Sequence, residues 1–154
     1  MATIPKKAIR KKKRVSSHAP RGWHTITPRL FAEDARALVT FVKRVFGGTG
    51  TYQAERPSEI RIGDSIVMIT EAGIRPPTPA FLYVYVADAD ATYRKAIKAG
   101  ARSIEEPTDM PYGDRRAMVD DRWGNTWQIA THLEGRSQAR PSASRRTVRL
   151  RRSS

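Results

Sequence analysis

The stretch from Met110 to His132 reads MPYGDRRAMVDDRWGNTWQIATH, and it is the most informative segment of this 154-residue sequence. Alternating apolar and polar side chains predict strands over Arg115–Val119 and Asn125–His132. The polar, glycine-containing segment Asp121–Asn125 predicts the tight turn between them. A loop over 107–113 precedes the hairpin. We therefore predict that the folded part of the chain ends in a β-hairpin, and that the preceding segments form the scaffold around it.

The segments before this hairpin show the same order of elements twice. The first half predicts a strand over 24–31, a helix that Gly47 and Gly48 end, and strands over 49–55, 58–62 and 65–70. The second half predicts a strand over 81–86, a helix that Gly100 ends, a short strand over 102–105 and the hairpin. An internal repeat of about 50 residues fixes the architecture. It predicts an α+β fold built from paired βαβββ modules.

The strand patterns also predict which face of each sheet packs under a helix. Along residues 81–86 two sets of side chains alternate, Leu82, Val84 and Val86 on one face and Phe81, Tyr83 and Tyr85 on the other. The aliphatic face suits packing under a helix, and the aromatic face, with two hydroxyls, suits a cavity wall. In the last strand Trp127 and Ile129 take the helix side and leave Gln128 for the cavity. In the first strand the apolar residues Ile26, Pro28 and Leu30 share one face.

The charge of the chain is concentrated at its ends. The net charge is +14, yet residues 1–23 hold eight lysines and arginines, residues 135–154 hold seven, and neither segment has an acidic residue. The part between them, 24–134, carries a net charge of −1. Both ends lack the apolar residues needed to offset the entropy of ordering, so we expect a disordered basic arm and a disordered basic tail. They are either solvated tails or contacts for a polyanion such as nucleic acid.

Several function classes are excluded or disfavoured by composition. The sequence has no cysteine, which excludes disulfides and a thiol nucleophile. No apolar run reaches membrane-spanning length, and the N-terminus lacks the apolar segment of a secretory signal, so we expect a cytoplasmic protein. The sequence shows no Ser-His-Asp spacing, phosphate-binding glycine loop or zinc-finger pattern.

A family resemblance rests on a series of short motifs spread in order over residues 24–134. They are Ile26-Thr27-Pro28, Val45-Phe46-Gly47, Ile60–Ser65, Tyr83–Val86, Asp90-Ala91-Thr92, Ala99-Gly100-Ala101, Tyr112–Arg115 and Ile129–His132. With these motifs the sequence resembles the glyoxalase/bleomycin resistance/dioxygenase (vicinal oxygen chelate) superfamily, and within it the PhnB-like branch. The resemblance implies two curved mixed sheets, each a cup, from modules 24–70 and 81–132 joined by a linker over 71–80. It also implies a homodimer.

The resemblance further implies where a metal would bind. Enzymes of the superfamily hold a divalent metal with four side chains, and these positions fall here on Pro28, Met68, Phe81 and Gln128. Proline and phenylalanine offer no ligand atom, and a thioether suits soft metals. Metal-dependent lyase or dioxygenase chemistry is therefore not expected. We predict no cofactor, although the sequence does not exclude a divalent metal.

The candidate ligand-binding residues combine the aromatic strand face with nearby polar groups. They are Met68, Phe81, Tyr83, Tyr85, Tyr112, Arg115 and Gln128. We expect Asp114 to brace Arg115, whose planar guanidinium suits a carboxylate or phosphate. We expect His24 and His132 to be structural residues at strand ends, and Asp120 and Asp121 to be turn residues.

Three functions agree with these residues. The first is a glyoxalase-like protein that sequesters a small aromatic or amphipathic molecule in the cup without a family-type metal. The second is an enzyme that uses the same polar groups with no metal or with a weakly held one. The third is a binding module whose basic ends contact nucleic acid.

The third alternative gives a first prediction. Deleting residues 1–22 and 136–154 is expected to abolish any affinity for duplex DNA, because the remaining chain is nearly neutral. Phosphate contacts release counterions, so the affinity of the full chain should fall steeply as salt rises. Fluorescence anisotropy with a labelled duplex at two salt concentrations measures both effects. DNA affinity that survives the deletion would assign this role to residues other than the basic ends.

Overall fold

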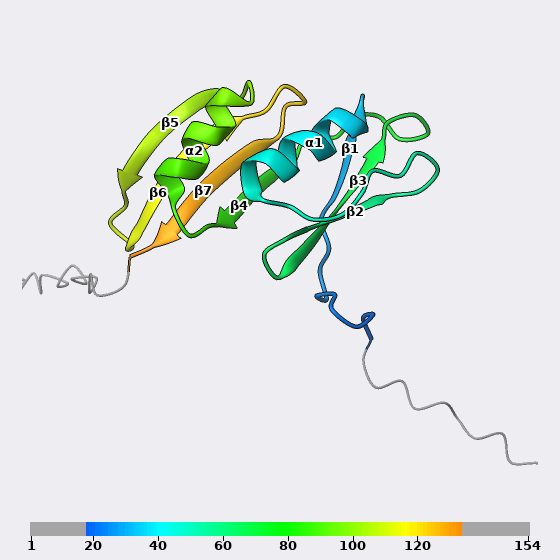
Figure 1. Cartoon of the computed structure of the whole chain (residues 1–154), viewed down its shortest axis with the longest axis horizontal. Coiled ribbons are helices and arrows are strands. Elements are labelled where there is room, and N and C mark those ends of the chain that lie inside the picture. The colour runs from blue at the N-terminus through cyan, green and yellow to red at the C-terminus, as the bar shows by residue number, and fades with distance from the viewer. Residues whose placement is uncertain (1–17, 134–154) are drawn as a thin grey trace, which may run out of the picture. The chain divides into compact units, whose positions relative to one another are not determined.

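The computed structural model describes residues 18–133 (Figure 1). Of the predicted arm over 1–23, residues 1–17 lie outside the described part, as does the predicted tail over 135–154. The chain divides into two compact units, one ending at Thr78 and the other beginning at Pro79. This boundary falls within the segment 71–80 that the sequence predicts as a linker. No helix of the described part is long and apolar enough to cross a membrane.

The first unit consists of one helix and a three-stranded mixed sheet. Its elements are β1 (Arg29–Ala32), α1 (Ala35–Phe46), β2 (Ser58–Ile62) and β3 (Ser65–Glu71). The strand order is β1-β3-β2, with β1 parallel and β2 antiparallel to β3. Leu38, Val42 and Val45 of α1 are buried, which matches the helical spacing of apolar residues in the sequence.

The start of α1 is held by a side chain from the far end of β3. The Glu71 carboxylate accepts hydrogen bonds from the backbone N–H groups of Asp34 (2.8 Å) and Ala35 (2.9 Å). The Asp34 side chain itself accepts from the Ala37 N–H. These are N–H groups that a helix leaves without intrahelical partners. The helix ends at Phe46, and the capping residue Gly47 has a φ of 67°, which favours glycine.

The first unit differs from the sequence prediction at two strands. The first strand begins only at Arg29, Ile26 is exposed, and Leu30 is buried together with Ala32, so the predicted shared face of Ile26, Pro28 and Leu30 is wrong. The expected strand over 49–55 reduces to one bridge between Thr49 and Arg61. The chain leaves the strand conformation at Gly50, whose φ is 127°, and only glycine fits there because a Cβ would lie 2.3 Å from the Glu59 carbonyl oxygen.

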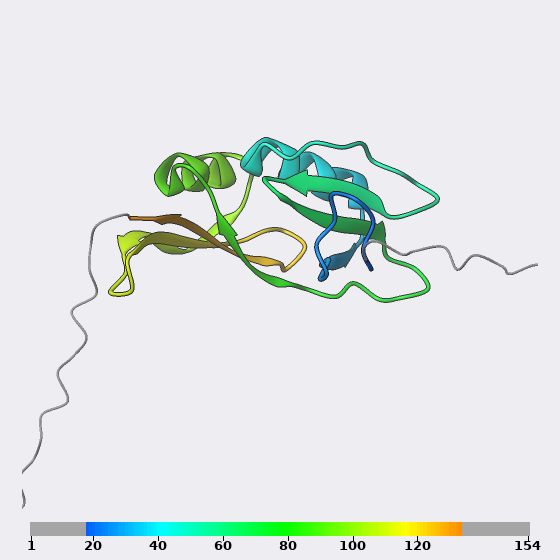
Figure 2. The same ribbon diagram turned by 90° about the horizontal axis from the view of Figure 1, so that it is seen from below.

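The second unit repeats the arrangement with a larger sheet. Its elements are β4 (Phe81–Tyr85), α2 (Ala89–Lys98), β5 (Arg102–Asp109), β6 (Asp114–Asp120) and β7 (Thr126–His132). The strand order is β4-β7-β6-β5, with β4 parallel to β7 and the other pairs antiparallel. Figure 2 shows α2 on one face of this sheet. The predicted α+β class with repeated βαβββ-type units is confirmed.

The two faces of the second sheet carry the side chains that alternation predicts. Ala117, Val119, Trp127 and Ile129 are fully buried, and Ala96 of α2 is buried with them. Phe81, Tyr83 and Tyr85 are exposed on the opposite face. The edge strand β5 runs four residues beyond its predicted end at 105, with irregular pairing to β6 at two places. The hydrophobic core of this unit therefore lies under α2, and its other sheet face is aromatic and polar.

The turn between β6 and β7 is organised by one buried carboxylate. Asp121 Oδ1 accepts from the backbone N–H groups of Trp123 and Asn125, each at 2.9 Å. Its Oδ2 accepts from Asn125 Nδ2 and from the indole Nε1 of Trp127, again at 2.9 Å each. Asn125 Oδ1 in turn accepts from the N–H of Ala80 at 3.0 Å. The predicted turn role of Asp121 is confirmed, and the same network attaches the start of β4.

This network gives a stability prediction. Asp121→Ala removes the acceptor of four donors, and buried donors left without partners should lower the free energy of unfolding by roughly 3 kcal/mol. Urea unfolding followed by circular dichroism measures the loss. Asp64→Ala, at an exposed hairpin tip of the first unit, is the matched control and should cost much less. Equal losses in the two variants would contradict a central role for Asp121.

Candidate functional site

The exposed face of the second sheet contains a buried carboxylate with three side-chain hydrogen bonds. Asp114, the first residue of β6, is 3% exposed. Its Oδ2 accepts from the hydroxyls of Tyr83 at 2.6 Å and Tyr85 at 3.0 Å. Its Oδ1 lies 2.9 Å from Nδ1 of His132. Strands β4, β6 and β7 thus each contribute to one cluster, which we call the Asp114 cluster: Tyr83, Tyr85, Asp114 and His132.

Strand register explains why these four residues meet. Asp114 pairs directly with His132 across β6 and β7, and Tyr85 pairs with Ala130 across β4 and β7. Because β7 lies between β4 and β6, the tyrosine hydroxyls reach Asp114 only by extending across β7. Ala130 is fully buried there and its small side chain leaves room. The two tyrosine rings lie side by side with centroids 5.2 Å apart.

The ionisation of the cluster follows from these bonds. Burial raises the pKa of Asp114, but hydrogen bonds from Tyr83, His132 and Tyr85 outweigh burial and hold that pKa below its ordinary value of 3.8. Burial and the hydrogen bonds with Asp114 and Tyr112 raise the pKa of Tyr83 well above 10.0. The hydrogen bond to Asp114 and burial raise the pKa of Tyr85 as well. At neutral pH the carboxylate is charged and both phenols keep their protons.

This ionisation fixes the tautomer of His132. An ionised carboxylate only accepts hydrogen bonds, so the proton between Asp114 Oδ1 and His132 must reside on Nδ1. In the neutral imidazole the other nitrogen, Nε2, then carries a lone pair. The His132 side chain is 64% exposed, and its Nε2 has no hydrogen-bond partner among residues 18–133. Nε2 is therefore available to accept a proton.

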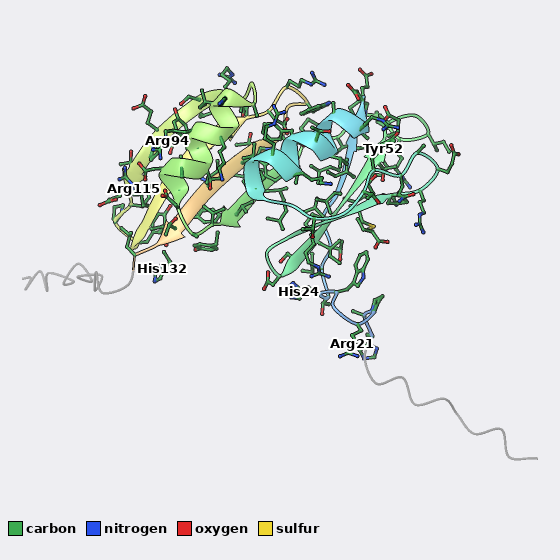
Figure 3. All side chains as sticks on the ribbon, in the orientation of Figure 1. Arg21, His24, Tyr52, Arg94, Arg115 and His132 are labelled. Carbon is green, nitrogen blue, oxygen red and sulfur yellow. The ribbon has the colours of Figure 1, made fainter. Side chains whose placement is uncertain are left out.

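Arg115 occupies the other face of the sheet and is fully engaged there. Its Nε and Nη2 bind both oxygens of Asp90 at the start of α2, at 2.5 and 2.8 Å, and its Nη1 binds Asp109 of β5 at 3.0 Å. The expectation that Asp114 braces Arg115 is wrong, because neighbouring residues of a strand point to opposite faces. Figure 3 shows Arg115 and His132 near the same end of the sheet. Arg115 ties α2 to β5.

The other predicted pocket residues are divided between the two units. Phe81, Tyr83, Tyr85 and Gln128 share the exposed face, and Tyr112 lies in the loop beside them, with its hydroxyl next to Tyr83 and 3.5 Å from Nη1 of Arg116. Gln128 is half-buried and pairs with Tyr83 on one side and Met118 on the other. Met68 belongs to β3 of the first unit, where it pairs with Arg29 and Glu59.

The positions that correspond to the metal ligands of the superfamily do not fit a divalent metal. Pro28 and Phe81 have no side-chain donor atom, and Met68 is half-buried with a soft thioether. Gln128 pairs in register with Tyr83, and Phe81 pairs with Thr126, so no second metal-ligating side chain lies directly opposite Gln128 on β4. Within residues 18–133 no group of three or more histidine, aspartate or glutamate side chains is placed to hold a metal.

Three residues of this face were not selected by the sequence reasoning as binding residues: Asp114, His132 and Arg116. The predicted hairpin contained a usable signal, because counting outward from the turn pairs Asp114 with His132. Arg116 forms an ion pair with Glu105, and its Nε is the one buried side-chain nitrogen or oxygen of the described part that lacks a hydrogen bond. It therefore retains a donor for which the fold supplies no acceptor.

Two further features of the first unit do not contribute to this cluster. His24 lies before β1, with Nδ1 3.3 Å from the Ser65 hydroxyl and an exposed side chain. An open hollow of about 210 Å³ is lined by residues of the loop before β2 and of β2 itself: Gly50, Thr51, Gln53, Arg56, Pro57 and Glu59. None of these lining residues belongs to the predicted pocket.

The fold and the sequence together identify the class of protein. The model of the Glyoxalase/Bleomycin resistance protein/Dioxygenase superfamily matches residues 22–129, and the chain belongs to this superfamily. An uncharacterized protein of Mycobacterium bovis is 25% identical over 122 residues, which cover 68% of this chain and 80% of that protein. An uncharacterized protein of Mycobacterium tuberculosis is also 25% identical, with 72% of it covered.

Solved structures show the same fold. TioX from Micromonospora sp. ML1 superposes with a TM-score of 0.60 at 25% identity, covering 70% of this chain and 98% of that chain. A glyoxalase/bleomycin resistance protein/dioxygenase family enzyme from Burkholderia phytofirmans PsJN gives 0.60 at 21% identity, covering 70% and 97%. These likenesses confirm the predicted glyoxalase fold.

The raised tyrosine pKa values give a pH prediction. Folding favours the protonated form of Tyr83, so its contribution to stability is present below pH 10.0 and is lost as pH rises further. An alkaline titration followed by ultraviolet absorbance counts the tyrosines that ionise well above pH 10.0. Tyr83→Phe should have one such tyrosine fewer than the unchanged protein, and its free energy of unfolding should fall less steeply as pH rises. Tyr52→Phe, in the first unit, is the control. Identical titration curves for Tyr83→Phe and the unchanged protein would contradict the Asp114 cluster.

Proposed function

We propose that this protein binds a small aromatic molecule on the exposed face of its second sheet, without a metal of the superfamily type. One observation carries the proposal. Three aromatic side chains of one strand, Phe81, Tyr83 and Tyr85, face solvent beside the buried, charged carboxylate of Asp114. Apolar rings next to a few oriented polar groups are the usual composition of a small-molecule site.

The exposure of the aromatic rings supports this function. Phe81 is 66% exposed and Tyr85 is 63% exposed, although both lie within a regular strand. Large apolar side chains gathered on one face mark binding surfaces more often than isolated exposed residues do. A flat ligand that covers these rings would gain apolar burial and offset stacking.

The polar groups of the same face support selective binding of that ligand. The tyrosine hydroxyls are held by Asp114, so their rings keep a fixed orientation. Gln128 offers an amide next to Tyr83, and the hydroxyl of Tyr112 lies beside the same tyrosine. These groups can orient a polar substituent of the ligand. Arg115, which the sequence suggested for this role, is committed to Asp90 and Asp109.

The donor chemistry favours metal-independent binding over the metal-dependent reactions of the superfamily. The four corresponding positions supply one amide oxygen, one thioether and two side chains without any donor atom. Lewis-acid activation of a substrate oxygen needs a firmly held ion with several hard ligands. This set does not supply them, so recognition rests on the protein side chains alone.

A binding experiment with paired variants of one tyrosine tests the proposal. A panel of aromatic compounds is screened by thermal shift, and hits are measured by isothermal titration calorimetry. Tyr85→Leu removes the ring and should weaken binding by about fivefold, corresponding to about 1 kcal/mol of ring stacking. Tyr85→Phe keeps the ring but loses the hydrogen bond to Asp114, so it should weaken binding less than Tyr85→Leu does.

The control is Tyr52→Leu, because Tyr52 lies in the first unit, where the guanidinium of Arg36 stacks on its ring. It should leave the affinity unchanged. Aromatic ligands that bind Tyr85→Leu and the unchanged protein equally would refute the proposed face. Stoichiometric zinc, nickel or iron in the purified protein would refute the metal-free mode.

A further inference from the structure

We propose that His132, oriented by Asp114, accepts a proton from an acidic hydroxyl group of an aromatic ligand bound beside it. The ligand class is therefore a phenol or a closely related hydroxyarene. This inference rests on the proposed function, because it assumes that an aromatic molecule occupies the face formed by Phe81, Tyr83 and Tyr85. It adds the chemical group that the ligand must carry and the atom that receives its proton.

The first step of the argument is the orientation of the imidazole. Asp114 is buried and accepts from two tyrosine hydroxyls, so His132 must donate through Nδ1 to the remaining carboxylate oxygen. This bond holds the ring and directs Nε2 away from Asp114.

The second step is the position of the imidazole next to the aromatic face. Tyr85 and His132 bind the two different oxygens of one carboxylate, at 3.0 and 2.9 Å. The imidazole therefore lies beside the hydroxyl end of the Tyr85 ring. A ligand ring stacked on Tyr85 would bring its own substituent to this end of the face. Phe81, at the other end of β4, would contact the part of the ligand far from that substituent.

The third step is the polarity of the site at this end. The protons of both tyrosine hydroxyls are committed to Asp114, so neither hydroxyl readily donates to a ligand. Nε2 of the neutral His132 tautomer is an acceptor, and it has no partner in the described part. A ligand group that satisfies Nε2 must bring its own proton. A hydroxyl does so, whereas a carboxylate or carbonyl does not.

The proton balance of the transfer is closed. The O–H bond of the ligand breaks, an N–H bond forms at Nε2, and the ligand becomes a phenolate. The imidazolium that results forms an ion pair with Asp114. No oxidant, reductant or other reactant is needed.

The other charged and titratable groups of this face add no net charge next to His132. They are Arg116 on β6, its ion-pair partner Glu105 on β5, Tyr112 in the preceding loop, and the protonated Tyr83 and Tyr85 on β4. At the other end of β6, Asp120 forms an ion pair with Arg102 of β5. The charges of Arg116 and Glu105 offset each other, which leaves Asp114 as the unbalanced charge next to His132.

The test uses 4-nitrophenol, because its phenolate absorbs visible light and the phenol does not. Affinity is measured by calorimetry, and the ratio of phenolate to phenol is read from the absorbance of the bound probe. We expect this ratio to be roughly tenfold higher for bound than for free probe, equivalent to a shift of about one pKa unit. His132→Gln should abolish the increase while the probe still binds, and His24→Gln, in the first unit, should leave it unchanged.

Asp114→Asn gives a sharper variant. The amide Nδ2 of the asparagine would donate to Nδ1 of His132 and so place the imidazole proton on Nε2, which removes the acceptor. Nitrogen chemical shifts of the imidazole in long-range ¹H–¹⁵N spectra report the tautomer. They should show Nδ1–H in the unchanged full-length protein and Nε2–H in the variant. If Asp114→Asn does not fold, His132→Gln, altered at an exposed side chain, carries the test.

The outcomes separate this inference from the proposed function. Binding of 4-nitrophenol with no rise in the phenolate ratio, or an Nε2–H tautomer in the unchanged protein, would overturn the inference and leave the aromatic site standing. Binding of 4-nitroanisole, which has no acidic hydroxyl, together with no binding of 4-nitrophenol would do the same. No binding of any aromatic probe would overturn both.

Discussion

The structure of the second unit depends on the carboxylate of Asp121. Its four hydrogen-bond donors close the turn between β6 and β7, and the turn sets the register of the two strands. That register pairs Asp114 with His132 at the opposite end of the hairpin. A slip by one residue would move Asp114 to the helix side and bury its charge among apolar side chains. The candidate site therefore depends on a turn six residue pairs away.

The hairpin contains two buried aspartates that bind different kinds of hydrogen-bond donor. One has a structural role and the other belongs to the candidate site. Asp121 is surrounded by backbone, amide and indole N–H groups, which suits a fixed corner. Asp114 is bound by two phenols and an imidazole, side chains whose protons can respond to a ligand. The same residue type thus serves as a turn anchor at one end of β6 and as the centre of the candidate site at the other.

Much of the fold could be predicted from the sequence, because short local patterns determine its helices, strands and turns. The alternation along 81–86, the helix stop at Gly47 and the turn at Asp121 all lie within a few neighbouring residues. The prediction of a strand over 49–55 was wrong, because the close approach of Gly50 to the Glu59 carbonyl is a tertiary feature that neighbouring residues do not reveal. The site was predicted only in part. Its aromatic residues could be predicted from the alternation along one strand. The pairing of Asp114 with His132 depends on the register of β6 and β7, and the strand alternation of β6 places Arg115 on the opposite face.

The tyrosine rings of the Asp114 cluster have a thermodynamic consequence for recognition. Each ring is fixed at its backbone by β4 and at its hydroxyl by Asp114, and Ala130 lies beneath the path between these two points. Such a ring has little rotamer freedom left to lose when a molecule settles on it. The side chains of the contact surface therefore lose their conformational entropy when the protein folds and not when the ligand binds. The face is preorganised, so even a small ligand with few contacts retains most of its interaction energy as affinity.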